Sequence, residues 1–174
     1  DVLNVAWLTE MATWCAEQRL TVKGHPLVFA RVLPWAEELS LDTLEARLWN
    51  RVSREVSAFR GLIGLWDVVN EPAQMVEKAE WLGGSSTGEL YQARGAVQVT
   101  KTAFDLARAA NPEAVLVLND WDTSDRFLNL IARCLDAGAP IDAVGLQYHE
   151  LEHYGGPEQA WEVCERFAAL GLPL

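Results

Sequence analysis

Four short segments of the sequence carry side chains that can move protons or bind hydroxyl groups. His25 lies in the first, Asn70 and Glu71 end the second, and residues 119–122 and 147–150 supply further acids, amides and an imidazole. A carboxylic acid can protonate a leaving oxygen while a second carboxylate attacks or activates water, and amides both donate to and accept from sugar hydroxyls. These residue types suit the cleavage of glycosidic bonds. Crowding among carboxylates raises the pKa of one of them toward the working pH, which makes Glu71 a candidate acid.

These groups can act together only if the fold brings them to one place. Hydrophobic spacing predicts helices over residues 3–19, 41–59, 89–110, 124–135 and 157–171, and strands over 21–29, 62–70, 114–119 and 141–147, with another strand starting at 172. Strands separated by helices imply right-handed crossovers and a parallel sheet, which leaves a doubly wound sheet and a (β/α)8 TIM barrel open. In either fold the carboxyl ends of the strands share one rim, and all four segments would meet there.

The composition narrows the possible partners. The chain has 174 residues, of which 50% are hydrophobic, and a net charge of −11. A chain this acidic is a poor candidate for binding nucleic acid or an anionic membrane. No apolar run approaches the roughly 18 residues of a membrane span. The three cysteines are odd in number and widely spaced, so we expect no disulfide framework or zinc knuckle, and Cys134 and Cys164 are predicted to lie in the core.

The tryptophans and several glutamates are interpreted from the predicted elements in which they lie. Four tryptophans fall within predicted helices and are expected to pack there: Trp7, Trp14, Trp49 and Trp161. Four lie in or beside strand ends and loops and are candidates for stacking on sugar rings: Trp35, Trp66, Trp81 and Trp121. Six glutamates are predicted to form solvated faces: Glu37, Glu38, Glu45, Glu55, Glu77 and Glu80.

Residues 66–71 read Trp-Asp-Val-Val-Asn-Glu and resemble the WDVVNE strand of glycoside hydrolase family 10, the endo-β-1,4-xylanases. Three more segments match in order: residues 24–35 resemble GHTLVWH followed by LP, residues 118–121 resemble the NDY strand, and residues 141–149 resemble IDGIGLQSH. The resemblance implies a partial (β/α)8 barrel running from about helix 2 to the start of strand 7. Residues 1–174 would form a single incomplete catalytic domain of a secreted or periplasmic enzyme.

The resemblance also implies the chemistry. Glu71 would be the general acid/base of a retaining enzyme that hydrolyses xylan or a related polysaccharide, with no metal and no cofactor. Asn70 would hold the 2-hydroxyl of the sugar at the cleavage point, and His25 would contact the same sugar. The nucleophile would be a glutamate beyond Leu174, so we expect residues 1–174 alone to be inactive.

Four further residues receive roles from the same resemblance. Gln147 and His149 would lie beside the nucleophile, with His149 hydrogen-bonded to it. Asn119 and Trp121 would support the site.

Two alternatives remain open at this stage. Phe29-Ala30 and Val32 replace a Trp-His pair and a Gln of the family pattern, which removes polar contacts near the cleaved sugar and leaves Phe29 as a substrate contact. A non-catalytic carbohydrate-binding relative is therefore the first alternative. The second is a zinc metalloprotease, because His149-Glu150-Leu151-Glu152-His153 matches H-E-x-x-H. That chemistry needs both histidines on one helix, whereas residues 141–146 predict a strand and Gly155-Gly156-Pro157 would break a helix.

Overall fold

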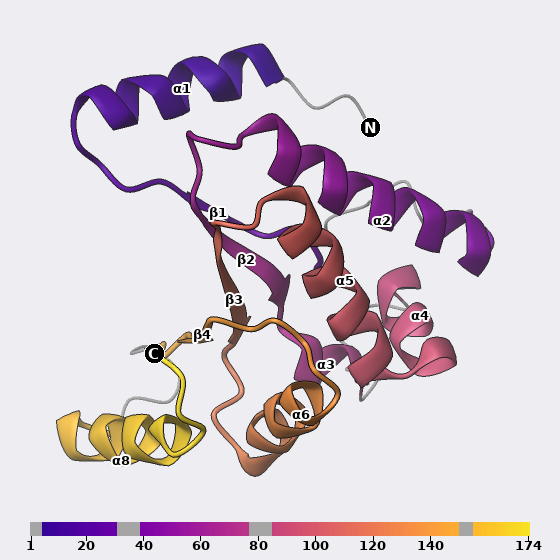
Figure 1. The fold of residues 1–174 in the computed structure, drawn as a ribbon. Helices are drawn as coiled ribbons and strands as arrows, with labels where there is room; N and C mark the ends of the chain where they lie inside the picture. Colours follow the sequence, from indigo (N-terminus) through magenta and orange to yellow (C-terminus); the bar gives the residue numbers. More distant parts are fainter. Residues whose placement is uncertain (1–4, 31–38, 77–84, 150–154) are drawn as a thin grey trace.

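A computed structural model describes residues 5–30, 39–76, 85–149 and 155–174 of the chain. Its strands are β1 (Lys23–Gly24), β2 (Leu65–Asn70), β3 (Val115–Asp120) and β4 (Ala143–Leu146). Its helices are α1 (Val5–Glu17), α2 (Leu41–Ala58), α3 (Pro72–Val76), α4 (Ser86–Arg94), α5 (Ala96–Ala110), α6 (Asp125–Asp136) and α8 (Pro157–Ala168). Helices and strands alternate along the chain, as the hydrophobic spacing predicts (Figure 1).

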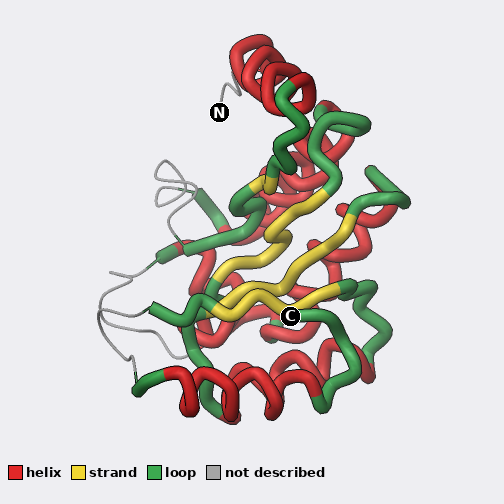
Figure 2. The backbone as a smooth tube through the Cα atoms, turned by 90° about the vertical axis from the view of Figure 1, so that its left-hand side faces the viewer, coloured by secondary structure: helices red, strands yellow, loops and turns green. Residues whose placement is uncertain are grey.

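The four strands form one parallel sheet in the order β1-β2-β3-β4. Figure 2 views this sheet from its open side, with helices behind the strands. The last residues continue the same arrangement, since the amide of Val144 donates to the carbonyl of Pro173 over 2.9 Å. This contact places the C-terminal segment beside β4, where the sequence predicts that a further strand begins.

Local sequence explains where two of the helices begin. The Ser40 side chain accepts from the backbone amide of Thr43 at the start of α2, and Ser124 does the same for Arg126 at the start of α6. Such caps satisfy amides that have no partner within the helix. Along α2, Leu44, Leu48, Val52 and Val56 are buried at a spacing of four residues, so one stripe of the helix faces the core.

The core lies between the sheet and these helices. Val68, Leu116 and Leu118 contribute fully buried side chains from β2 and β3, and burial of a side chain of this size stabilises the fold by roughly 1.5–3 kcal/mol. Phe127 of α6 and Phe167 of α8 pack with their ring centroids 5.7 Å apart. This contact fixes α8 against α6 next to the carboxyl end of β3.

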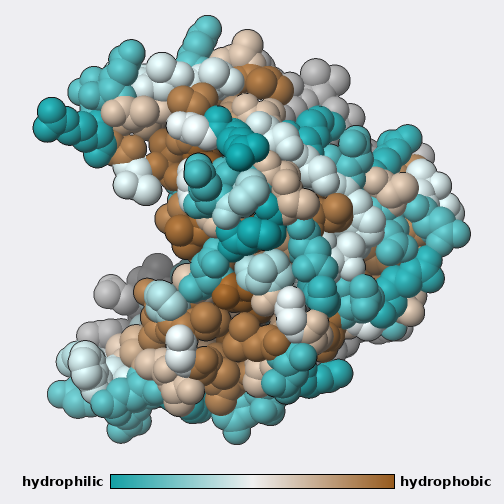
Figure 3. Space-filling view, in the orientation of Figure 1, coloured by the Kyte–Doolittle hydropathy of each residue, from teal (hydrophilic) through white to brown (hydrophobic). Residues whose placement is uncertain are grey.

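The opposite side of the sheet is open. Figure 1 shows α1 beyond one end of this side and α8 at the other, and Figure 3 shows the surface hollowed between them with hydrophobic residues around the opening. A four-stranded parallel sheet with helices along one side is half of the layout of a (β/α)8 barrel, whose interior this open side corresponds to.

Three predictions of secondary structure were wrong in detail. The helix expected over residues 89–110 is two helices, because Gly95 between them has φ +87°, a conformation outside the helical region. The strand expected over residues 21–29 is reduced to β1 and an isolated bridge between Val28 and Val69. Pro26 has no amide hydrogen to give to a ladder, which explains the interruption. The short helix α3 was not predicted.

Several predictions of burial were also wrong. Trp7, Trp14 and Trp161 are 58%, 56% and 67% exposed instead of packed between helices, whereas Trp49 packs against the core as predicted. Cys164 is exposed, whereas Cys134 is buried as predicted. A helical spacing identifies a face, but it does not supply the surface that covers it.

Two residues expected near solvent are buried. The indole of Trp66 is 4% exposed, donates to the carbonyl of Ile63 over 3.1 Å, and lies where a side chain at Gly24 would be. It is therefore a core residue and not a sugar platform. Glu55 is 6% exposed and pairs with Arg51 at 2.9 Å and with Arg54 at 3.3 Å. Trp35, Trp81, Glu37, Glu38, Glu77 and Glu80 lie outside the described residues.

In the described part of the chain, no helix is both long enough and apolar enough to cross a membrane.

Candidate active site

Three of the four predicted segments converge on the carboxylate of Glu71. The amide nitrogen of Asn70 donates to Oε1 of Glu71 over 3.0 Å, and that of Gln147 reaches the same oxygen over 3.3 Å. Gln147 also donates to Oδ1 of Asn70 over 2.9 Å. Asn70 is buried and Glu71 is half-buried, so the carboxylate is held by amides on its inner side and can still be reached from the rim.

Asn119 of β3 extends this network under the carboxylate. Its amide nitrogen donates to Oδ1 of Asn70 over 2.6 Å. The two asparagines are paired in the register of β2 and β3, and Asn119 is paired in turn with Gly145 of β4. A Cβ at Gly145 would lie 2.3 Å from Oδ1 of Asn119. Gly145 therefore leaves the space in which the Asn119 amide turns toward Asn70.

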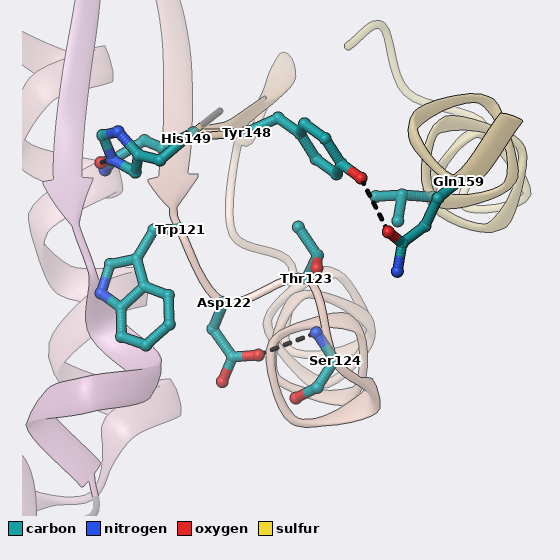
Figure 4. Close-up of a pocket in the computed structure, with 9 residues that line it drawn as sticks. Trp121, Asp122, Thr123, Ser124, Tyr148, His149 and Gln159 are labelled. Atoms are coloured by element: carbon teal, nitrogen blue, oxygen red, sulfur yellow. Dashed lines mark hydrogen bonds between the residues drawn. The ribbon is translucent and has the colours of Figure 1, made fainter. Parts of the chain in front are cut away.

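His149 and Trp121 lie on the outer side of the network, where Figure 4 shows a pocket between the ends of β3 and β4 and helix α8. The imidazole of His149 is hydrogen-bonded to Oε1 of Gln147 over 3.0 Å. The pocket encloses about 180 Å³ and combines polar groups with the rings of Trp121 and Tyr148. An indole face beside hydroxyl-binding groups is suited to a sugar ring.

His25 belongs to a second cluster centred on Asp67 of β2. Nδ1 of His25 lies 2.7 Å from Oδ2 of Asp67, and Nζ of Lys23 lies 2.8 Å from the same oxygen. Asp67 is fully buried, whereas the side chain of His25 is 49% exposed. The imidazole is therefore anchored from below and presents its other edge to the open side of the sheet.

Helix α2 holds the backbone that carries His25. The guanidinium of Arg51 donates to the carbonyls of Pro26 and Leu27, and it pairs with Glu55 on the same helix. Burial lowers the pKa of Arg51, and the charge of Glu55 opposes this shift. The buried ion pair therefore fixes the segment that follows His25.

The backbone at Glu71 is in an uncommon conformation. Its φ is +57°, which costs a residue other than glycine about 1–2 kcal/mol. Just upstream, the register between β2 and β3 shifts between Asp67 and Val69, so Val68 is an extra residue in β2. Bulges of this kind redirect a strand next to active sites. Together the bulge and the left-handed residue direct Glu71 toward Asn70 and Gln147.

Asp120 is the carboxyl in this region whose pKa is raised toward neutrality. Burial raises the pKa of Asp120 to about 7, and the nearby carboxylates of Asp122 and Glu71 add to the shift. Hydrogen bonds from the backbone amides of Asp122 and Ala73 oppose it. Asp120 is fully buried, so its role is toward neighbouring protein groups and not toward solvent.

Most of the predicted site residues thus fall into two groups, and Trp121 lies in the pocket beside the first of them. One hydrogen-bonded network joins five of them: Asn70, Glu71, Asn119, Gln147 and His149. His25 contacts Asp67, and Phe29 follows Val28, whose carbonyl accepts from the backbone amide of Asn70 over 2.9 Å. Lys23 and Asp67 were not among the predicted site residues, and Asp120 was expected only as one of the acids of residues 119–122. A charged residue within an otherwise apolar strand, as at Asp67, was a signal that could have found one of them.

The described residues contain no group of three or more His, Cys, Asp or Glu side chains that could hold a metal ion. His149 lies in the irregular segment after β4 and is not helical, which is the wrong context for the first histidine of a zinc-protease helix. Glu150 and His153 lie outside the described residues.

The model of Glycosyl hydrolase family 10 matches residues 3–174. The chain belongs to glycosyl hydrolase family 10. It is 31% identical to endo-1,4-beta-xylanase B of Thermotoga neapolitana, covering 89% of this chain and 45% of that protein. It is 28% identical to a beta-1,4-xylanase of Dictyoglomus thermophilum, covering 94% of this chain and 47% of that protein.

Solved structures give the same result for the family 10 fold. Native xylanase 10B from Thermotoga maritima aligns with a TM-score of 0.80 at 27% identity, covering 99% of this chain and 54% of that one. Xylanase 10B from Thermotoga petrophila in complex with xylobiose aligns with a TM-score of 0.78 at 26% identity, covering 99% and 53%. The chain spans about half the length of the curated relatives it matches. The predicted family and partial (β/α)8 barrel are confirmed.

Proposed function

We propose that this family 10 chain is part of a retaining endo-β-1,4-xylanase whose general acid/base is Glu71. The observation that carries the proposal is the Glu71 carboxylate, bound by the amides of Asn70 at 3.0 Å and Gln147 at 3.3 Å at the carboxyl end of the sheet. The relatives named as xylanases and the related enzyme solved with xylobiose support xylan as the substrate.

In the proposed reaction, the Glu71 carboxyl gives its proton to the glycosidic oxygen as the bond to the anomeric carbon breaks. A second carboxylate attacks that carbon from the opposite face and forms a covalent glycosyl-enzyme. Glu71, now ionised, takes a proton from the water that displaces this carboxylate, which restores both groups and retains the configuration. We expect the nucleophile on the strand that follows residues 172–174, about 5–5.5 Å from Glu71. Residues 1–174 are then one part of a single catalytic domain.

The remaining site residues are proposed to bind the sugar chain. Asn70 would hold the 2-hydroxyl of the sugar at the cleavage point, and His25, anchored on Asp67, would contact the same sugar. Trp121 would stack on a neighbouring sugar in the pocket beside His149. Contacts that strengthen in the transition state would lower the barrier and not only improve binding. Because the substrate is a polymer found outside cells, we propose that the protein is secreted or periplasmic.

The proposal is tested by Glu71→Gln in the full-length protein. The amide cannot donate a proton as an acid, so we expect xylan turnover to fall by about 10²- to 10⁴-fold while the melting temperature changes little. Glu113→Gln is the matched control, because Glu113 is an exposed glutamate on the loop before β3. Reducing-sugar release from xylan is the measurement. Full turnover by Glu71→Gln would reject Glu71 as the acid.

One observation favours a second candidate. Phe29-Ala30 and Val32 stand where the family pattern has polar groups near the cleaved sugar, which fits a carbohydrate-binding relative without activity. Xylo-oligosaccharide binding by the full-length protein, measured by calorimetry, without any release of reducing sugar would support that candidate against the enzyme.

A further inference from the structure

The chain passes from β2 into α3 through a turn at Glu71, and the backbone amides of Glu71 and Ala73 are both bound by adjacent residues of β3. The amide of Glu71 donates to the carbonyl of Asn119 over 2.7 Å. Pro72 has no amide hydrogen. The amide of Ala73 donates to Oδ2 of Asp120 over 2.9 Å. Among the described residues, no other side chain is hydrogen-bonded to a backbone amide of Glu71 or Ala73.

Both carboxylate oxygens of Asp120 accept a hydrogen bond from a backbone amide. Its other carboxylate oxygen, Oδ1, accepts from the backbone amide of Asp122 over 2.9 Å, so the side chain cannot rotate without losing a bond. Burial raises the pKa of Asp120 to about 7, which shows that a charge here is costly. A position that served packing alone would hold an apolar side chain at less cost.

The segment that Asp120 binds follows directly on the left-handed residue Glu71, with φ +57°. If the bond to Ala73 were lost, the turn could relax to an ordinary conformation. The carboxylate of Glu71 would then leave the amides of Asn70 and Gln147. Strain of this type persists only where surrounding contacts determine it.

We propose that Asp120 is a positioning residue, which holds the turn after β2 so that the Glu71 carboxyl is aligned with the glycosidic oxygen of the substrate. The inference rests on the proposed function of Glu71 as the acid. Asp120 touches no substrate in this role, since it acts through the backbone of Ala73.

The experiment uses two substrates of the full-length enzyme that differ in their need for an acid. Xylotetraose has a poor leaving group that must be protonated, whereas dinitrophenyl β-xylobioside has a leaving group that departs without a proton. For both, kcat/KM reports the step that breaks the glycosidic bond. A misplaced acid therefore lowers kcat/KM for xylotetraose only, whereas partial unfolding lowers both values equally and leaves their ratio unchanged.

With Asp120→Asn, we expect kcat/KM for xylotetraose to fall by about 10- to 100-fold, since a displacement of about 1 Å costs a factor of this size. The value for the dinitrophenyl substrate should stay within about threefold of wild type, because that step needs no proton. The loss of kcat/KM for xylotetraose relative to the loss for the dinitrophenyl substrate should be larger in Asp120→Ala than in Asp120→Asn, because Asn keeps one acceptor oxygen for the two amides.

Asp142→Asn is the matched control. Its carboxylate also accepts a backbone amide across the sheet, that of Leu116 at 2.8 Å, but at the opposite end of the strands. It should change neither value. Equal losses on both substrates, or no loss, in the Asp120 variants would overturn the proposal. If wild-type enzyme cleaves neither substrate, the proposed function itself is rejected.

Discussion

The two ends of the parallel sheet are held by polar contacts of different kinds. At the carboxyl end, side chains from three strands bind one another: Asn119 binds Asn70 at 2.6 Å, and Gln147 binds Asn70 at 2.9 Å. Asp120 also binds backbone at this end, whereas at the amino end the side chains that bind backbone are an ion pair, Arg108 with Asp142. Asp142 accepts from the amide of Leu116, and Arg108 donates to the carbonyl of Ala114.

This difference has a physical consequence. A side chain bound to backbone has a partner whose place is already set by the strand. Side chains bound to one another depend on each member of the network for their positions, so a substitution of one member displaces the others. We therefore expect substitutions at the carboxyl end to alter activity through residues they do not touch, and those at the amino end to alter stability alone.

Among substitutions that leave Glu71 in place, the largest effect is expected from Asn70→Ala. It removes the acceptor of two amides and a donor to Glu71. Loss of one aligned hydrogen bond to a reacting group costs about 10²- to 10³-fold in rate, and we expect a loss of this order in xylan turnover. Gln98→Ala, which removes an exposed amide on α5, is the control. Turnover within a factor of two of wild type would show that the network is not interdependent.

Gly145→Ala should have the next largest effect without removing any polar group. The added methyl would lie 2.3 Å from Oδ1 of Asn119, so the Asn119 side chain must shift and its hydrogen bond to Asn70 is disturbed. Overpacking of this kind costs about 1–3 kcal/mol in the free energy of unfolding, and xylan turnover should fall as well. Gly64→Ala at the amino end is matched, because nothing lies within 4 Å of its added methyl. Denaturant unfolding and turnover assays on both variants make the comparison.

The pH dependence of stability should distinguish Asp120 from other carboxylates. Its pKa is raised by burial from 3.8 to about 7, so between these values the folded state binds more protons than the unfolded state. The free energy of unfolding then decreases as pH rises through this window, by at most about 1.4 kcal/mol per pH unit. Denaturant unfolding at pH 4, 5, 6 and 7 gives the free energies of unfolding of wild type and Asp120→Asn, and the difference between them should change with pH. A constant difference across the window would contradict the shift.

The smallest effect is expected at the amino end from Asp142→Ala. Its carboxylate pairs with Arg108 and accepts the amide of Leu116, but the side chain is 39% exposed. Solvent can replace part of both interactions, so we expect a loss of about 1 kcal/mol or less in the free energy of unfolding. Xylan turnover should be unchanged at a temperature where the variant is folded. A tenfold loss of turnover would remove the distinction between the two ends.

Periodicity and strand-end reasoning predicted which residues meet, but not how they are bound. The alternation of helices and strands placed Asn70, Glu71, Asn119 and Gln147 on one rim, and the structure confirms that they meet there. The hydrogen bond from the backbone amide of Ala73 to the carboxylate of Asp120 could not be predicted in this way, because it depends on the turn at Glu71.

Register was the other missing information. The extra residue Val68 shifts the pairing of β2 with β3, and this shift brings Asn70 level with Asn119. Gly145 matters only because the same register brings it level with Asn119. A pattern of hydrophobic residues identifies the buried face of a strand, whereas register depends on contacts between segments that are far apart in the sequence.

The exposure of three tryptophans determines what fluorescence reports for this chain. Trp7, Trp14 and Trp161 lie more than half exposed on α1 and α8, whereas Trp66 is buried in the sheet beside Phe59. Indoles in water emit at longer wavelength before unfolding as well as after it. The emission spectrum of residues 1–174 should therefore already be shifted toward the red in the folded state. Circular dichroism would therefore follow the unfolding of the sheet better than the wavelength of tryptophan emission.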